Sequence, residues 1–186
     1  QELVNEGKIR AIGVSNMSNA QMDEWRKTAP IHTLQPSYNI LENKLFEDQI
    51  PYCLENDINV IAYSSLCRGL LSGKYYVGMK FREGDMRNED DPKFQGENFK
   101  NHIAAVDALK QYAEQFGKSV SELAVRWVLD KGVSCALWGA RTPEQLDNIP
   151  GVMGWSLTKE QCQEMEDIVA KYVPVQVGKE FLTPPY

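Results

Sequence analysis

A short apolar segment followed by a helix-like segment recurs four times along this chain of 186 residues. Each apolar segment has the length of a buried strand, and the four occupy residues 9–14, 33–36, 58–63 and 133–138. Strands that alternate with helices in this way usually pair in parallel, with the helices packed against the sheet. The pattern therefore predicts an α/β fold in which four parallel strands are wrapped by outer helices.

The helical segments carry recognisable start signals. Two pairs of residues have the spacing of a capping box, and these are Ser18 with Gln21 and Ser119 with Glu122. Thr142 followed by Pro143 predicts a further helix start, and Thr158 predicts the start of a last helix. Apolar residues at helical spacing predict two more helices, over residues 46–56 and 99–116.

Two segments lack a clear period. Residues 75–98 are polar and rich in Asp, Glu, Gly and Arg, so we expect a surface loop that lies over another part of the molecule. Residues 173–186 hold three prolines and are expected to form an extended tail.

Charge and cysteine content exclude several classes of protein. The net charge of -6 and the pI near 5.0 argue against nucleic-acid binding, and no apolar stretch is long enough for a membrane span. The four cysteines have neither CxxC spacing nor close pairing. They predict reduced thiols in a cytoplasmic protein, with no disulfide framework and no metal site.

The functional-looking residues follow the predicted strands directly. They stand at the carboxyl ends of the four runs, as Ser15 with Asn16, Gln35 with Tyr38, Tyr63 with Ser64, and Gly139 with Arg141. Ligands of parallel α/β folds bind at that end of the sheet. Residues 59–74 end in small hydroxyls, glycines and Lys74, which suits phosphate binding but equally suits an ordinary strand–helix turn. A GxGxxG motif is absent.

Residues 7–16, GKIRAIGVSN, resemble a fifth-strand motif of the aldo-keto reductase family. Gln35 ahead of Tyr38, residues 63–74 and residues 139–146 resemble the sixth, seventh and eighth strands of that family, in order. Residues 81–87, FREGDMR, are similar to a loop of its bacterial branch that acts on sugars, polyols and small aldehydes. The resemblance implies that residues 1–186 are the carboxyl-terminal half of a single (β/α)8 TIM-type barrel, whose amino-terminal half would be their partner.

The resemblance also implies roles for individual residues around NADPH, with NADH possible. Ser15, Asn16 and Gln35 would hold the nicotinamide carboxamide, and Tyr63 would stack on the nicotinamide ring. The pyrophosphate would lie against Ser64, Leu66, Gly69 and Lys74, with Arg87 reaching over the cofactor. The adenosine end would be surrounded by Gly139, Arg141, Gln145 and Asn148, with Arg141 facing a 2'-phosphate.

Two positions depart from the family pattern. Trp138 replaces the common proline before Gly139, and Asn148 with Ile149 replaces a carboxylate–Asn pair. Trp138 and Trp127 are interpreted as packing residues, and Cys67 as a space-filling residue.

The resemblance implies that catalysis depends on residues outside this chain. In this family a tyrosine protonates the carbonyl oxygen, assisted by lysine, aspartate and histidine, and all four lie on the first four strands. No catalytic residue is therefore assigned here. His32 is expected just before a strand and His102 on the exposed side of a helix, and neither receives a catalytic role.

We expect an NADPH-dependent oxidoreductase that acts on a carbonyl or alcohol substrate and needs a full-length chain for activity. Two alternatives remain open at this point. One is a non-catalytic NADP(H)-sensing subunit of the same fold, and the other is an unrelated phosphate-binding barrel such as an aldolase or isomerase.

Overall fold

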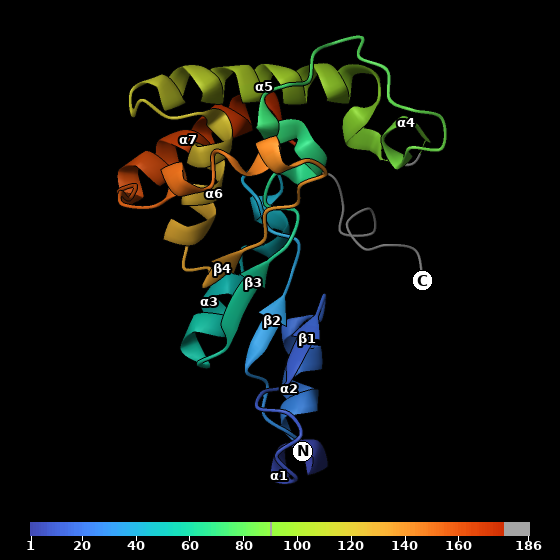
Figure 1. The fold of residues 1–186 in the computed structure, drawn as a ribbon, viewed down its shortest axis with the longest axis vertical. Coiled ribbons are helices and arrows are strands. Elements are labelled where there is room, and N and C mark those ends of the chain that lie inside the picture. Colours follow the sequence, from blue (N-terminus) through green and yellow to red (C-terminus); the bar gives the residue numbers. More distant parts are fainter. Residues whose placement is uncertain (90, 177–186) are drawn as a thin grey trace.

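The computed structural model describes residues 1–89 and 91–176, and it contains one four-stranded sheet. The strands are β1 (Gly13–Ser15), β2 (Thr33–Gln35), β3 (Asn59–Ala62) and β4 (Cys135–Ala136). They lie in the order β1-β2-β3-β4, and every neighbouring pair is parallel (Figure 1). The predicted α/β fold with four parallel strands is confirmed.

The strands are shorter than the apolar runs that predicted them. β1 begins only at Gly13, because the backbone N–H of Ile12 donates to Nδ1 of His32 at 3.0 Å instead of to a strand. His32 thus has a structural role next to β2. β4 pairs with β3 only at Cys135 and Ala136, so most of residues 133–138 lies outside the ladder.

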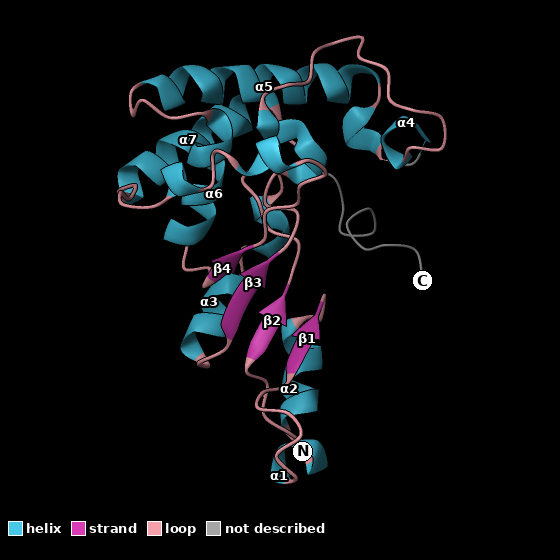
Figure 2. Cartoon of the chain, viewed as in Figure 1, coloured by secondary structure: helices cyan, strands magenta, loops and turns pink. Residues whose placement is uncertain are grey.

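Helices precede and follow the strands (Figure 2). The α-helices are α1 (Glu2–Asn5), α2 (Asn19–Arg26), α3 (Gln49–Glu55), α4 (Met86–Glu89), α5 (Gly96–Glu114), α6 (Val120–Asp130) and α7 (Lys159–Tyr172). The 3-10 helices are η1 (Asn43–Phe46), η2 (Cys67–Ser72), η3 (Pro92–Phe94), η4 (Pro143–Leu146) and η5 (Pro150–Val152). Both predicted capping boxes are present, and Thr158 forms a third one at the start of α7.

Three predictions about the segments between the strands need correction. After Thr142 the chain forms only the single 3-10 turn η4, which buries no residue and is soon followed by Pro150. The helix predicted over residues 46–56 is present as α3, but it begins only at Gln49, and Phe46 instead ends the separate 3-10 turn η1. Residues 75–98 are not a plain surface loop, because they form α4 and η3 and bury Phe94, which packs on Phe81 and Phe99.

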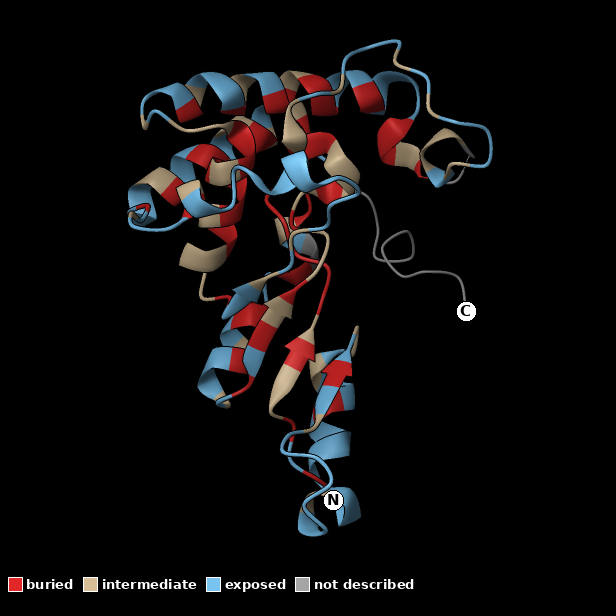
Figure 3. Ribbon diagram, viewed as in Figure 1, coloured by how far each residue is buried: buried red, intermediate tan, exposed pale blue. Residues whose placement is uncertain are grey.

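The core lies on one face of the sheet and between the long helices. Val14, Leu34 and Val60 occupy one row across β1, β2 and β3 and are buried. Trp127 of α6 is fully buried and stacks on Tyr38, with ring centroids 5.3 Å apart, so its predicted packing role is confirmed. Figure 3 shows the buried residues concentrated where α5, α6 and α7 pack together, while α1 is mostly exposed.

The opposite face of the sheet is incompletely covered within the described residues. Gly13 and Ser15 of β1 are exposed, and their partners Thr33 and Gln35 are only partly buried. Parallel sheets are normally covered on both faces. That an amino-terminal half of a barrel covers this face stays a prediction.

The end of the chain is described only in part. Val173 is buried, and Gln176 exchanges hydrogen bonds with the loop at η1, accepting from the N–H of Lys44 at 2.9 Å and donating to Asn43 at 2.8 Å. The rest of the predicted extended tail, residues 177–186, lies outside the described residues.

Candidate functional site

A cavity of about 670 Å³ lies at the carboxyl ends of β3 and β4. It is lined mainly by the segment after β3, by part of residues 75–98, which we call the insertion, and by the segment after β4. Most of the residues predicted to bind a cofactor line it, namely Tyr63, Ser64, Leu66, Gly69, Lys74, Arg87, Gly139, Arg141, Gln145 and Asn148. The structure therefore brings together residues that lie far apart in the sequence.

The remaining predicted residues, Ser15, Asn16 and Gln35, lie at the ends of β1 and β2, beside this cavity rather than in its wall. Ser15 pairs with Gln35 in the sheet, and the Ser15 hydroxyl donates to the carbonyl of Gln35 at 2.9 Å. Asn16 has a φ of 55° and accepts a hydrogen bond of 3.1 Å from the Tyr63 hydroxyl. Tyr63 thus connects these strand ends with the cavity.

The turn after β3 has an unusual backbone. Ser64, Cys67 and Arg68 have φ angles of 58°, 47° and 51°, and Gly69 has a φ of 93°. L-residues rarely adopt this left-handed region, and such strain concentrates at ligand-binding sites. A Cβ atom on Gly69 would lie 2.3 Å from the Tyr75 hydroxyl, so only glycine fits there.

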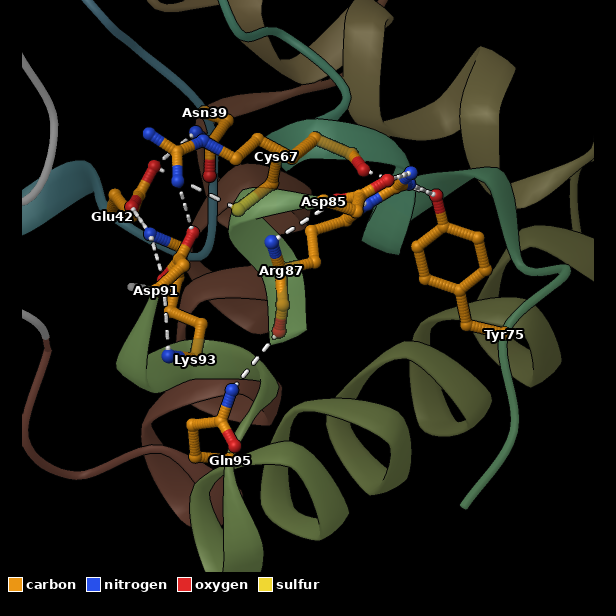
Figure 4. A network of polar contacts seen from close by, with 10 residues as sticks. Asn39, Glu42, Cys67, Tyr75, Asp85, Arg87, Asp91, Lys93 and Gln95 are labelled. Atoms are coloured by element: carbon orange, nitrogen blue, oxygen red, sulfur yellow. Dashed lines mark hydrogen bonds and ion pairs between the residues drawn. The ribbon is translucent and has the colours of Figure 1, made fainter. Parts of the chain in front are cut away.

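Arg87 is held by groups of the insertion itself (Figure 4). Its guanidinium forms an ion pair with Asp85, donates to the Tyr75 hydroxyl, and lies 4.4 Å from the centroid of the Phe81 ring. The hydrogen bonds from Arg87 lower the pKa of Asp85 to about 2. Arg87 lines the cavity, but its position is set by Asp85, so reaching over a ligand remains a prediction.

The segment after β4 forms the opposite wall. The backbone N–H of Arg141 donates to Oε1 of Gln145 at 2.8 Å, while Nδ2 of Asn148 lies 3.3 Å from the hydroxyls of both Ser119 and Ser121. These bonds fix the backbone here and leave the exposed side chain of Arg141 at the cavity.

Trp138 differs from its interpretation as a packing residue. It lines the cavity, and its indole Nε1 donates to the carbonyl of Gln145 at 3.0 Å. Because η4 is a single turn without a buried face, the indole lies against this turn and not in the core.

A buried group of charges beneath the cavity was not foreseen. Glu42 and Lys93 each have 1% exposed side chains, and Asp91 has none exposed. Asp91 also pairs with Arg68, whose guanidinium lies 2.6 Å away. No pattern in the sequence indicated this network. A Lys, Asp or Glu is rarely buried unless it is paired, and the sequence does not show which of these charged residues pair with one another.

His102 and Cys67 are both buried in the structure. His102 was expected to be exposed, but it is 2% exposed, and its Nδ1 lies 2.7 Å from the carbonyl of Asn98. Burial lowers its pKa, and the residue belongs to the buried part of α5. Cys67 is fully buried, and burial raises its pKa well above the usual range, as suits a space-filling residue.

All four cysteines are free thiols, and three of them are buried. Among residues 1–89 and 91–176, no cluster of His, Cys, Asp and Glu is arranged to hold a metal ion. Over the same part of the chain, no helix is both long and apolar enough to cross a membrane.

Comparisons with known proteins agree with the architecture. Residues 1–170 match the sequence model of the aldo/keto reductase family. The chain is 47% identical over 187 residues to the aldo-keto reductase YhdN of Bacillus subtilis, covering 100% of this chain and 56% of that protein. It is 28% identical over 197 residues to the aldo-keto reductase yakc [NADP(+)] of Schizosaccharomyces pombe, covering 100% and 58%.

A solved structure is also similar. The glycerol dehydrogenase AKR11B4 from Gluconobacter oxydans superposes with a TM-score of 0.89 at 47% identity, over 96% of this chain and 54% of that one. The chain thus spans little more than half the length of the relatives that it matches.

Proposed function

The chain belongs to the aldo/keto reductase family, and from this we propose that it is the cofactor-binding, carboxyl-terminal half of an NADPH-dependent reductase barrel. The complete protein would transfer hydride reversibly between the nicotinamide and the carbonyl group of an aldehyde, ketone or sugar. Reduced, largely buried cysteines suit a cytoplasmic location for it.

One observation carries the proposal. Lys74 and Arg141 are two of the five Lys and Arg residues that line the same cavity as the strained turn at Ser64 and Gly69. Cations suit the phosphates of a dinucleotide, and a turn that only glycine fits lets the backbone approach them closely. The volume of about 670 Å³ lies within the range of cofactor pockets.

The residues present fit each part of the cofactor. Ser15, Asn16 and Gln35 provide the donors and acceptors that a carboxamide needs, and they lie next to Tyr63. When bound, NADPH would supply the hydride. The chain's own residues would hold the nicotinamide ring on Tyr63 and the phosphates between Lys74 and Arg141.

Replacement of Tyr63 tests the nicotinamide end. In the full-length protein, Tyr63→Ala should weaken NADPH binding by about 1 kcal/mol or more, because it removes an aromatic surface for stacking. The measurement is a fluorescence titration with NADPH. Tyr76→Ala serves as the control, since Tyr76 is 63% exposed and does not line the cavity. Equal affinities of Tyr63→Ala and the wild type would count against the placement.

Replacement of Arg141 tests the preference for NADPH over NADH. Arg141→Ala should raise the Michaelis constant for NADPH roughly three- to tenfold, because the substitution removes the exposed guanidinium that would pair with the 2'-phosphate. The constant for NADH, which lacks that phosphate, should hardly change. Arg10→Ala, a change at another exposed arginine outside the cavity, should affect neither. If Arg141→Ala shifts both constants equally, the residue is structural.

The same experiments address the alternative of a cofactor sensor. NADPH binding without reduction of any aldehyde, ketone or sugar by the full-length protein would favour a non-catalytic subunit of this fold. The unrelated phosphate-binding barrel is set aside, because the family match covers residues 1–170.

A further inference from the structure

A continuous chain of ion pairs lies beneath the turn after β3. Lys93 Nζ lies 2.8 Å from Oε1 of Glu42 and 3.1 Å from Oδ1 of Asp91. The second carboxylate oxygen of Asp91 lies 2.6 Å from Nη1 of Arg68. Figure 4 shows Glu42, Asp91 and Lys93 of this chain close together. Two cations and two anions therefore balance, and all of their side chains except that of Arg68, which is 23% exposed, are at most 1% exposed.

The buried charges contact the strained turn at several points. Nδ2 of Asn39 donates to Oε2 of Glu42 at 2.7 Å and to the carbonyl of Ser64 at 3.2 Å. The thiol of Cys67 lies 3.7 Å from the same Glu42 oxygen. Arg68, the next residue, is held through its side chain by Asp91. The beginning and the end of the turn are thus fixed by one network.

This turn is the part of the cavity that needs such support. Ser64, Cys67 and Arg68 have positive φ angles, which persist only where the surrounding structure fixes them. The hydroxyl of Tyr75 supplements the network by donating to the carbonyl of Arg68 at 3.1 Å. Without the ion pairs, the turn would relax toward ordinary backbone angles and its polar groups would move.

Asp91 is the link between the insertion and the turn. Its carboxylate caps η3 by accepting from the backbone N–H of Lys93 at 3.1 Å, and it simultaneously pairs with Lys93 Nζ and Arg68. Asp91 itself does not line the cavity, whereas its network neighbours Glu42, Arg68 and Lys93 do. It can therefore act on a ligand only through these neighbours.

We propose that Asp91 is a positioning residue for the cofactor's pyrophosphate. Through Arg68 and Lys93 it fixes residues 64–69 in the conformation that meets the phosphate oxygens. This inference rests on the proposed function, and it assigns to the insertion a role in stabilising the backbone conformation of residues 64–69.

The test compares two conservative variants of the full-length protein. Asp91→Asn keeps the size of the side chain and the acceptor that caps η3, but removes the charge that holds Arg68. Asp130→Asn is the matched control, because Asp130 also pairs with an arginine, Arg126 at 2.8 Å, and accepts a backbone N–H from Leu157. Neither Asp130 nor Arg126 lines the cavity.

We expect both variants to lose thermal stability. Only Asp91→Asn should also bind NADPH about tenfold more weakly, because misalignment of one charge-assisted contact causes a loss of that size. The Michaelis constant for NADPH should rise by the same factor, and that for the carbonyl substrate less than twofold. An NADPH affinity of Asp91→Asn within twofold of the wild type, or an equal loss in Asp130→Asn, would overturn the inference.

A second variant keeps the inference testable if Asp91→Asn does not fold. Glu42→Gln leaves the pair of Asp91 and Arg68 in place, but removes the charge opposite Lys93, and it should weaken NADPH binding in the same direction by a smaller factor. Unchanged NADPH affinity in Glu42→Gln would also contradict the inference. If the wild-type protein binds no NADPH, the proposed function is wrong. If the wild type and the variants all bind NADPH equally well, only the inference about Asp91 is wrong.

Discussion

Residues 1–186 expressed alone should show no NADPH-dependent reduction of aldehydes. Hydride transfer to a carbonyl needs a proton donor at the developing alkoxide, and the family resemblance implies that this donor lies on strands outside the chain. General acid catalysis alone contributes about 10²- to 10⁴-fold, and misplacement of the substrate costs more. The loss of NADPH absorbance with a series of aldehydes measures this activity.

The same expectation covers the physical state of the chain. One face of its sheet is incompletely covered in the described residues, and the outer edges of β1 and β4 have no further strand beside them in the four-stranded sheet. Open edges favour association, so the isolated chain should aggregate or pack loosely. Joining it to an amino-terminal half of the same protein should restore turnover and a cooperative unfolding transition. A stable, active monomer of 186 residues would contradict the half-barrel proposal.

Trp127→Ala should lower the free energy of unfolding of the full-length protein by about 3–5 kcal/mol, as for other large-to-small changes in cores. Trp127 is fully buried in α6 and stacks on Tyr38. Its removal leaves a cavity between the helices and the chain that follows β2. Urea unfolding followed by circular dichroism gives the change.

Two controls accompany this variant. Trp25→Ala should cost less than about 1 kcal/mol, because Trp25 is 43% exposed on α2, so nearly half of its surface already contacts water. Trp127→Phe should cost less than Trp127→Ala, since the ring is retained and the indole Nε1 makes no hydrogen bond. Equal destabilisation by Trp25→Ala and Trp127→Ala would show that α6 does not anchor the core.

Local sequence patterns predicted the order and the parallel pairing of the strands well. Ser18, Ser119 and Thr158 begin helices as expected, because capping depends on residues only three positions apart. The ends of the strands were predicted less well, since β1 is limited by the side chain of His32, which replaces a backbone partner. Such a contact joins residues 20 positions apart and leaves no local signal.

The site was predictable where its residues directly follow strands. Tyr63 and Ser64 follow β3, Gly139 follows the predicted strand over residues 133–138, and the structure places all three at the cavity. The support beneath it was not predictable, because Glu42 and Lys93 meet only through the fold. The polar composition of residues 75–98 concealed that Asp91 and Lys93 are buried, and the helical spacing around His102 did not reveal which side of α5 faces the insertion.

The most direct test of the account is a crystal structure of the full-length protein grown with NADPH. We expect the nicotinamide to lie on Tyr63, the pyrophosphate against residues 64–74, and the 2'-phosphate beside Arg141. A dinucleotide bound away from this cavity, or one whose phosphates contact neither Lys74 nor Arg141, would contradict the proposed function.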